Sequence, residues 1–170
     1  MILVDDEDRE NEGDMVMAAQ DATPQNAISP DEALKRLLDG NARYVANAPE
    51  IQDYSAGRAA RAVSQHPIAA IVRCADSRVA PELAFDQGPG DLFVVRIAGN
   101  FITPESLASL EFGVKMLSIP LIMVLGHSNC GAISATIDTI DDHTVLPGHL
   151  PDLVQAIRPA VLAAQASNPQ

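Results

Sequence analysis

Two cysteines and a histidine stand at positions where they could bind a metal. Cys74 directly follows an apolar run, and His127 and Cys130 follow a later one, while the chain contains no other cysteine. Two thiolates and an imidazole suit Zn²⁺, and three protein ligands with a fourth position open to water are typical of a catalytic zinc. The alternative is two buried free thiols and a histidine that merely follows a strand, which is the commoner state of such residues.

The segments around these residues predict an α/β fold with a mostly parallel sheet flanked by helices. Apolar runs at 68–73, 91–98 and 119–126 are expected to be buried strands. A helix between the last two strands implies a right-handed crossover and parallel pairing. Because the carboxyl ends of parallel strands meet at one edge, where ligands bind, the three candidate ligands are expected to converge there.

Three helices are predicted from their start signals and apolar spacing. Ser29, Pro30 and Glu32 form a capping pattern that begins a helix, and further helices are expected at 103–116 and 151–166. No strand is expected after the last helix.

The residues beside the candidate ligands resemble the β-class carbonic anhydrases. CADSR at 74–78 followed by HSNC at 127–130 is similar to that family's Cys-x-Asp-x-Arg and His-x-x-Cys signature, and LLDGNARYV, FDQGPGDLFVVRIAGN and SLASLEFGVKML extend the resemblance. It implies zinc held by Cys74, His127 and Cys130, reversible hydration of CO₂ to bicarbonate and a proton, and a homodimer or tetramer. The family usually adds another strand after the last helix, and we expect that strand to be missing here.

The same resemblance implies that Asp76 and Arg78 form a dyad beside the metal. Arg78 can hold the carboxylate bidentately, and Asp76 can accept a hydrogen bond from water at the zinc. Released from Arg78, Asp76 could itself ligate zinc, so we expect activity to change with pH. The alternative is an ordinary surface ion pair.

Four other residues are weaker candidates. By the same resemblance, Gln87 matches a family glutamine that donates to bicarbonate across the dimer interface. Gly131 could begin a helix whose N–H groups face an anion, or it could simply allow close packing. His143 and His149 lie in a polar loop and could shuttle protons, but solvated loop histidines are commoner.

The first 28 residues are interpreted as a separate acidic arm. They closely resemble the start of 3,4-dihydroxy-2-butanone-4-phosphate synthase, a magnesium-dependent enzyme of riboflavin synthesis. That family's metal and sugar-phosphate loop would map to Arg9, Glu10, Glu12 and Asp14. The later parts of that enzyme do not follow, so we expect no synthase activity. Residues 29–170 are expected to form a C-terminally short anhydrase domain.

Charge and hydropathy exclude several classes of function. A formal net charge of -12 disfavours nucleic-acid binding, and no apolar run approaches the ~18 residues of a membrane span. The N-terminus lacks a secretory signal pattern, so a cytoplasmic location is expected. The alternatives to carbonic anhydrase are a non-catalytic zinc-binding fragment of the same fold, a hydrolase of CS₂ or COS on the same scaffold, and the synthase.

Overall fold

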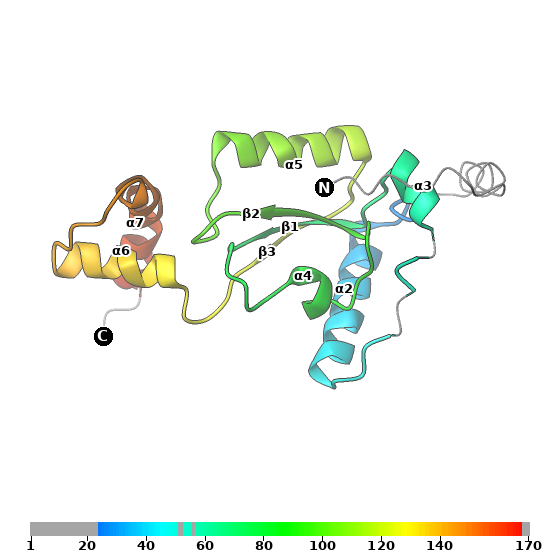
Figure 1. The fold of residues 1–170 in the computed structure, drawn as a ribbon, viewed down its shortest axis with the longest axis horizontal. Coiled ribbons are helices and arrows are strands. Elements are labelled where there is room, and N and C mark those ends of the chain that lie inside the picture. Colours follow the sequence, from blue (N-terminus) through cyan, green and yellow to red (C-terminus); the bar gives the residue numbers. More distant parts are fainter. Residues whose placement is uncertain (1–23, 51–52, 56, 168–170) are drawn as a thin grey trace.

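A parallel sheet forms the centre of the molecule. The computed structural model describes residues 24–50, 53–55 and 57–167, which Figure 1 shows as a ribbon. In this part of the chain, β1 (Ala69–Arg73), β2 (Leu92–Arg96) and β3 (Ile122–Leu125) form a three-stranded sheet in the order β2-β1-β3. Both outer strands run parallel to β1, so the predicted parallel α/β sheet is confirmed.

The helices begin at the predicted capping signals. The Ser29 hydroxyl accepts the Glu32 N–H at 3.1 Å ahead of α2 (Pro30–Val45), and Thr103 caps α5 (Pro104–Leu117) in the same manner. The last predicted helix is α7 (Leu150–Ser167).

Within the described part of the chain, three further helices connect these elements. They are α3 (Arg58–Val63), α4 (Pro81–Ala84) and α6 (Gly131–Asp141). No helix in the described residues is long and apolar enough to cross a membrane.

The sheet has a different helical layer on each face. Figure 1 shows α5 over one face and α2 and α4 on the other, with α6 and α7 beyond the carboxyl ends of the strands. On the α5 side, Leu110 and Ile119 pack with Ala70 and Val72 of β1. On the opposite side the core consists of Leu37, Ile68, Ala69, Ile71 and Phe85.

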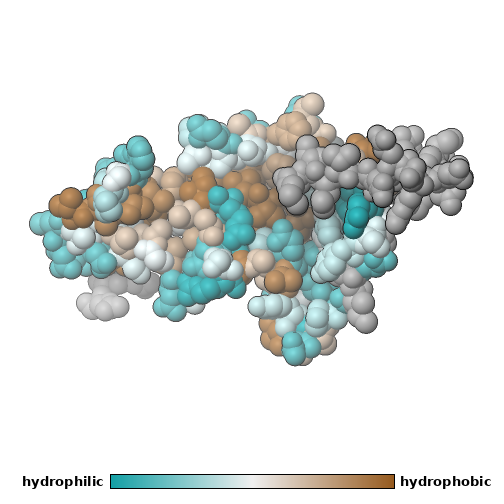
Figure 2. Space-filling view, in the orientation of Figure 1, coloured by the Kyte–Doolittle hydropathy of each residue, from teal (hydrophilic) through white to brown (hydrophobic). Residues whose placement is uncertain are grey.

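The expectation that all three strands are buried is wrong for β3 and also for β2, whose residues are half-buried except for the exposed Arg96. β1 is buried along its whole length, whereas Ile122 and Val124 of β3 are 44% and 67% exposed. β3 lies at the edge of the sheet, and α5 packs on Ala70 and Val72 of β1 rather than over β3. Hydrophobic residues are also exposed elsewhere on the surface, as Figure 2 shows.

The predicted arm is described only at its last residues. Asn26 is buried and donates a hydrogen bond to the carbonyl of Leu117, and Ile28 packs against the core beneath α2. These two residues therefore contact the sheet domain, while the division at residue 28 stays a prediction. Arg9, Glu10, Glu12 and Asp14 lie outside the described residues.

Candidate metal centre

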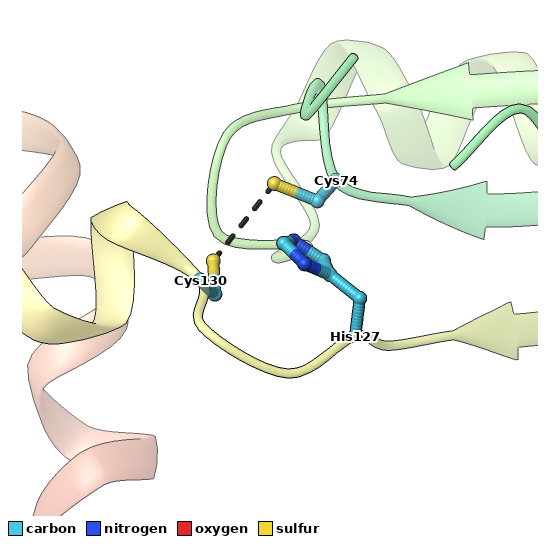
Figure 3. Close-up of side chains that lie close together, drawn as sticks. All are labelled: Cys74, His127 and Cys130. Carbon is cyan, nitrogen blue, oxygen red and sulfur yellow. Dashed lines mark hydrogen bonds between the residues drawn. The ribbon is translucent and has the colours of Figure 1, made fainter. Parts of the chain in front are cut away.

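The three predicted ligands converge at the carboxyl edge of the sheet. Cys74 directly follows β1, His127 follows β3, and Cys130 is the residue that precedes the first turn of α6. Figure 3 shows the three side chains pointing toward one another. The two Sγ atoms are 3.9 Å apart, and the three ligand atoms lie within 4.8 Å of one another. The convergence expected from strand order is therefore present.

The imidazole of His127 is oriented to act as a ligand through Nε2. Its Nδ1 lies 2.9 Å from the carbonyl oxygen of Ser128, which can only accept, so Nδ1 carries the proton and Nε2 keeps its lone pair. Nε2 is buried and has no hydrogen-bond partner among the residues that the structure describes. A buried acceptor without a partner costs free energy, and metal coordination would remove that cost.

The surroundings of Cys74 favour its thiolate. Burial raises the pKa of this thiol, but hydrogen bonding from the backbone of Asp76 and Gly99, followed by the effect of the neighbouring His127 and Cys130 side chains, lowers it to about 7. The Gly99 N–H donates to Sγ at 3.3 Å. Cys74 is therefore largely prepared for metal binding, which requires the deprotonated form.

These donor atoms fit zinc. Sulfurs at about 2.3 Å from a tetrahedral zinc lie roughly 3.8 Å apart, close to the separation of Cys74 and Cys130. Soft thiolates and one neutral imidazole are also the donors that distinguish zinc sites from those of magnesium or calcium.

Asp76 and Arg78 form the predicted ion pair next to this cluster. Arg78 Nη2 and Nε donate to the Asp76 carboxylate at 2.7 and 3.0 Å, and the backbone N–H of Arg78 adds a third bond of 2.9 Å. The guanidinium bonds, followed by that backbone bond, hold the pKa of Asp76 well below its usual range. Arg78 Nη2 also donates to the Asn129 carbonyl at 2.9 Å. The guanidinium thus connects the two loops that contain the candidate ligands.

Two arginines that the sequence analysis overlooked support the Cys74 loop. Arg73 is 1% exposed and donates to the carbonyls of Cys74 and Asp76 at 2.7 and 2.8 Å. Arg96, at the end of β2, donates to the Asp76 carbonyl at 2.8 Å. The sequence did contain a signal for these contacts, since an arginine ends each of two apolar strands. A charged residue at such a position needs polar partners.

The weaker candidates occupy different places. The Gln87 amide donates to the carbonyls of Phe85 and Asp86 in its own turn, at 2.8 and 3.2 Å, rather than to the cysteine–histidine cluster. Gly131 begins α6 immediately after Cys130, and His143 and His149 are exposed in the loop before α7. His149 lies 3.6 Å from Asp152. The metal cluster found in the described residues contains neither loop histidine.

Comparison with known proteins gives two family matches. Residues 69–170 match the family model for carbonic anhydrase, and residues 1–29 match the model for 3,4-dihydroxy-2-butanone 4-phosphate synthase. Both resemblances predicted from the sequence are therefore confirmed, the second for a short segment.

Curated relatives and a solved structure agree with the longer match. Carbonic anhydrase 2 of Mycobacterium tuberculosis is 47% identical over 135 residues, covering 79% of this chain and 65% of that protein. The carbonic anhydrase of Mycolicibacterium smegmatis is 45% identical over 135 residues, covering 79% of this chain and 66% of its own length. This chain thus spans about two thirds of these relatives.

The fold shows the same relationship. The structure of the Coccomyxa β-carbonic anhydrase in complex with acetazolamide aligns with a TM-score of 0.58 and 29% identity, covering 79% of this chain and 60% of that one. With the family model matching more than half of the chain, the chain belongs to the β-carbonic anhydrase family.

Proposed function

We propose that this chain holds Zn²⁺ through Cys74, His127 and Cys130 and catalyses the reversible hydration of CO₂ to bicarbonate and a proton. The observation that carries the proposal is the buried Nε2 of His127, which has no partner within 24–50, 53–55 and 57–167, beside two sulfurs that are 3.9 Å apart. Zinc, when bound, supplies hydroxide near neutral pH by lowering the pKa of water.

Asp76 is proposed to orient the attacking oxygen. Its low pKa keeps the carboxylate ionised throughout the neutral range. Its oxygens can therefore accept a hydrogen bond from an O–H group but cannot donate one. Arg78 fixes the plane of that carboxylate through two hydrogen bonds. If Arg78 released it, Asp76 would become a candidate fourth ligand, which would make activity depend on pH.

Gly131 and Gln87 remain candidate substrate contacts. The backbone N–H of Gly131 is at the start of the 11-residue α6, where unpaired N–H groups favour anions such as bicarbonate. To bind bicarbonate, the Gln87 amide would have to give up its hydrogen bonds to backbone carbonyls. We propose that it would then donate to bicarbonate across an interface between two copies of the chain.

Self-association and location complete the proposal. We propose a homodimer or a dimer of dimers in the cytoplasm, without nucleic acid or membrane as a partner. The net charge of -12 supports the exclusion of nucleic acid. The synthase-like segment is not proposed to be active, because the match to that family covers residues 1–29 alone.

Stopped-flow CO₂ hydration between pH 6 and 9, on protein of measured zinc content, tests the proposal. We expect turnover that rises with pH, and a Cys130→Ser variant that loses both zinc and turnover. Stoichiometric zinc without turnover of CO₂ would contradict the enzyme assignment. Parallel assays with CS₂ and COS would then separate a hydrolase from a non-catalytic zinc-binding domain.

A further inference from the structure

The helices α6 and α7 form a pair that stands apart from the core of the sheet. They pack chiefly against each other, beyond the carboxyl ends of the strands (Figure 1). Among the residues that the structure describes, neither hydrophobic cluster on the sheet contains a residue of α6 or α7. The buried residues of the pair are instead Thr136, Val154, Ile157 and Val161. The pair therefore does not share the core that joins the sheet to α2 and α5.

The pair meets the sheet domain next to the metal centre. A Cβ at Gly99, in the turn after β2, would lie 2.2 Å from Cδ1 of Ile157 and 3.2 Å from Cβ of Ala132, so this turn touches both helices. Arg78 donates to the carbonyl of Asn129, directly before α6, at 2.9 Å. That hydrogen bond is exposed, and such bonds contribute little to stability. The protein contacts that hold the pair in place are therefore few and small.

The three candidate ligands are divided between these two parts of the molecule. Cys74 and His127 follow strands of the sheet, whereas Cys130 belongs to α6, because its carbonyl accepts the Ser134 N–H at 3.0 Å as part of the first helical turn. The Cys130 sulfur lies 3.9 Å from that of Cys74. A metal bound by all three residues would therefore join the helix pair to the sheet.

The helix pair is too small to be stable when it is detached. α6 has 11 residues, and isolated helices shorter than about 12–15 residues are marginal in water. Even together, residues 131–167 are fewer than the roughly 40 below which a chain usually needs a metal, a disulfide or a partner to fold. A pair that lost its attachment to the sheet would therefore lose helical order as well.

We propose that metal binding docks the α6–α7 pair against the sheet domain, and that removal of the metal releases the pair. The metal-free chain keeps its sheet with α2 and α5, while residues 131–167 open. This inference rests on the proposed zinc ligands and adds a conformational change that the catalytic proposal does not require.

Hydrogen–deuterium exchange of the full chain, read by mass spectrometry with zinc bound and after chelation, tests this docking. We expect amides in 131–167 to exchange roughly tenfold or more faster after chelation, because local opening of the pair then costs less free energy. The buried strand β1 and helix α2 should keep their protection in both states. Returning zinc to the chelated chain should restore the protection of 131–167.

A pair of α6 variants provides the matched comparison. Cys130→Ser, measured with zinc present, should exchange in 131–167 like the chelated parent chain, because it removes the ligand that belongs to the helix pair. Ser134→Ala changes an exposed hydroxyl one helical turn away and leaves all three ligands in place. It should keep both the zinc and the protection of the parent chain.

The outcomes separate this inference from the proposed function. Stoichiometric zinc with equal exchange of 131–167 in both states would overturn the docking and leave the zinc site and the enzyme assignment standing. A uniform rise in exchange that includes β1 would also overturn it, because the metal would then support the whole fold. A chain that binds no zinc would overturn both proposals.

Discussion

Gly40 in the middle of α2 allows a decisive test of how the helix packs on the sheet domain. A Cβ at this position would lie 1.8 Å from the Phe85 carbonyl oxygen and 2.7 Å from its carbon. Real Cβ contacts are essentially never shorter than 3.0 Å, so Gly40→Ala requires a shift of at least about 1.2 Å. The obstacle is backbone, which cannot rotate away as a side chain can.

Two opposing effects determine the expected magnitude. Alanine is favoured over glycine inside a helix by about 1 kcal/mol, whereas overpacking a close contact costs about 1–3 kcal/mol and occasionally more. Because α2 also positions the fully buried Leu37, we expect packing to prevail, with a net loss of about 2 kcal/mol in the free energy of unfolding. At a typical urea m-value near 2 kcal/mol per molar, the unfolding midpoint would fall by about 1 M.

Equilibrium urea unfolding followed by circular dichroism measures this shift. Gly113→Ala in α5 is the matched control, since its Cβ would meet the flexible Cδ1 of Ile119 at 2.9 Å, and the midpoint should change little. A Gly40→Ala midpoint equal to or above that of the parent protein would refute the close packing of α2 against Phe85.

Three other predictions concern the site and its support. The pKa of Asp86 is lowered by the side-chain hydrogen bond from Arg43 and then by the backbone N–H of Glu50, so its stabilising contribution is complete above the unfolded pKa near 4 and is lost as pH falls toward the folded pKa. Asp86→Asn should therefore flatten the acid limb of the stability–pH curve measured by thermal unfolding, and an unchanged limb would contradict this. Arg78→Ala should lower zinc affinity or CO₂ turnover about 10–100-fold, measured by competition with a chelator and by stopped flow, because it frees Asp76 and the Asn129 carbonyl together. Removing zinc should make both cysteines react with a thiol reagent, and equal reactivity with and without chelator would argue against the assigned ligands.

The sequence predicted the parts of the fold that depend on local pattern. The capping signals at Ser29 and Thr103 marked true helix starts, and the apolar runs gave all three strands of the described sheet. The convergence of Cys74, His127 and Cys130 also followed from the sequence, because parallel topology alone brings the strand ends together.

Features that depend on what covers an element were not predictable in this way. The run at 119–126 has the composition of a buried strand, yet β3 is an edge strand, and no local pattern distinguishes the two. The contacts of Arg73 and Arg96 with the Cys74 loop required the register of β1 and β2, which places these two arginines side by side. The short α4 was missed because its four residues are too few to show a helical period.

Three structural requirements meet at Gly99. Its φ of +83° suits glycine, its N–H reaches the Cys74 sulfur, and a Cβ there would lie 2.2 Å from Cδ1 of Ile157 on α7. The same peptide unit thus touches both a candidate ligand and the helix pair at the far end of the chain. A change in α7 that displaces Ile157 would therefore move Gly99 and alter its hydrogen bond to the Cys74 sulfur. A variant could then lose its metal although all three ligands are intact. In a screen of variants, a low zinc content would also indicate that α6 and α7 do not pack correctly against the Gly99 turn.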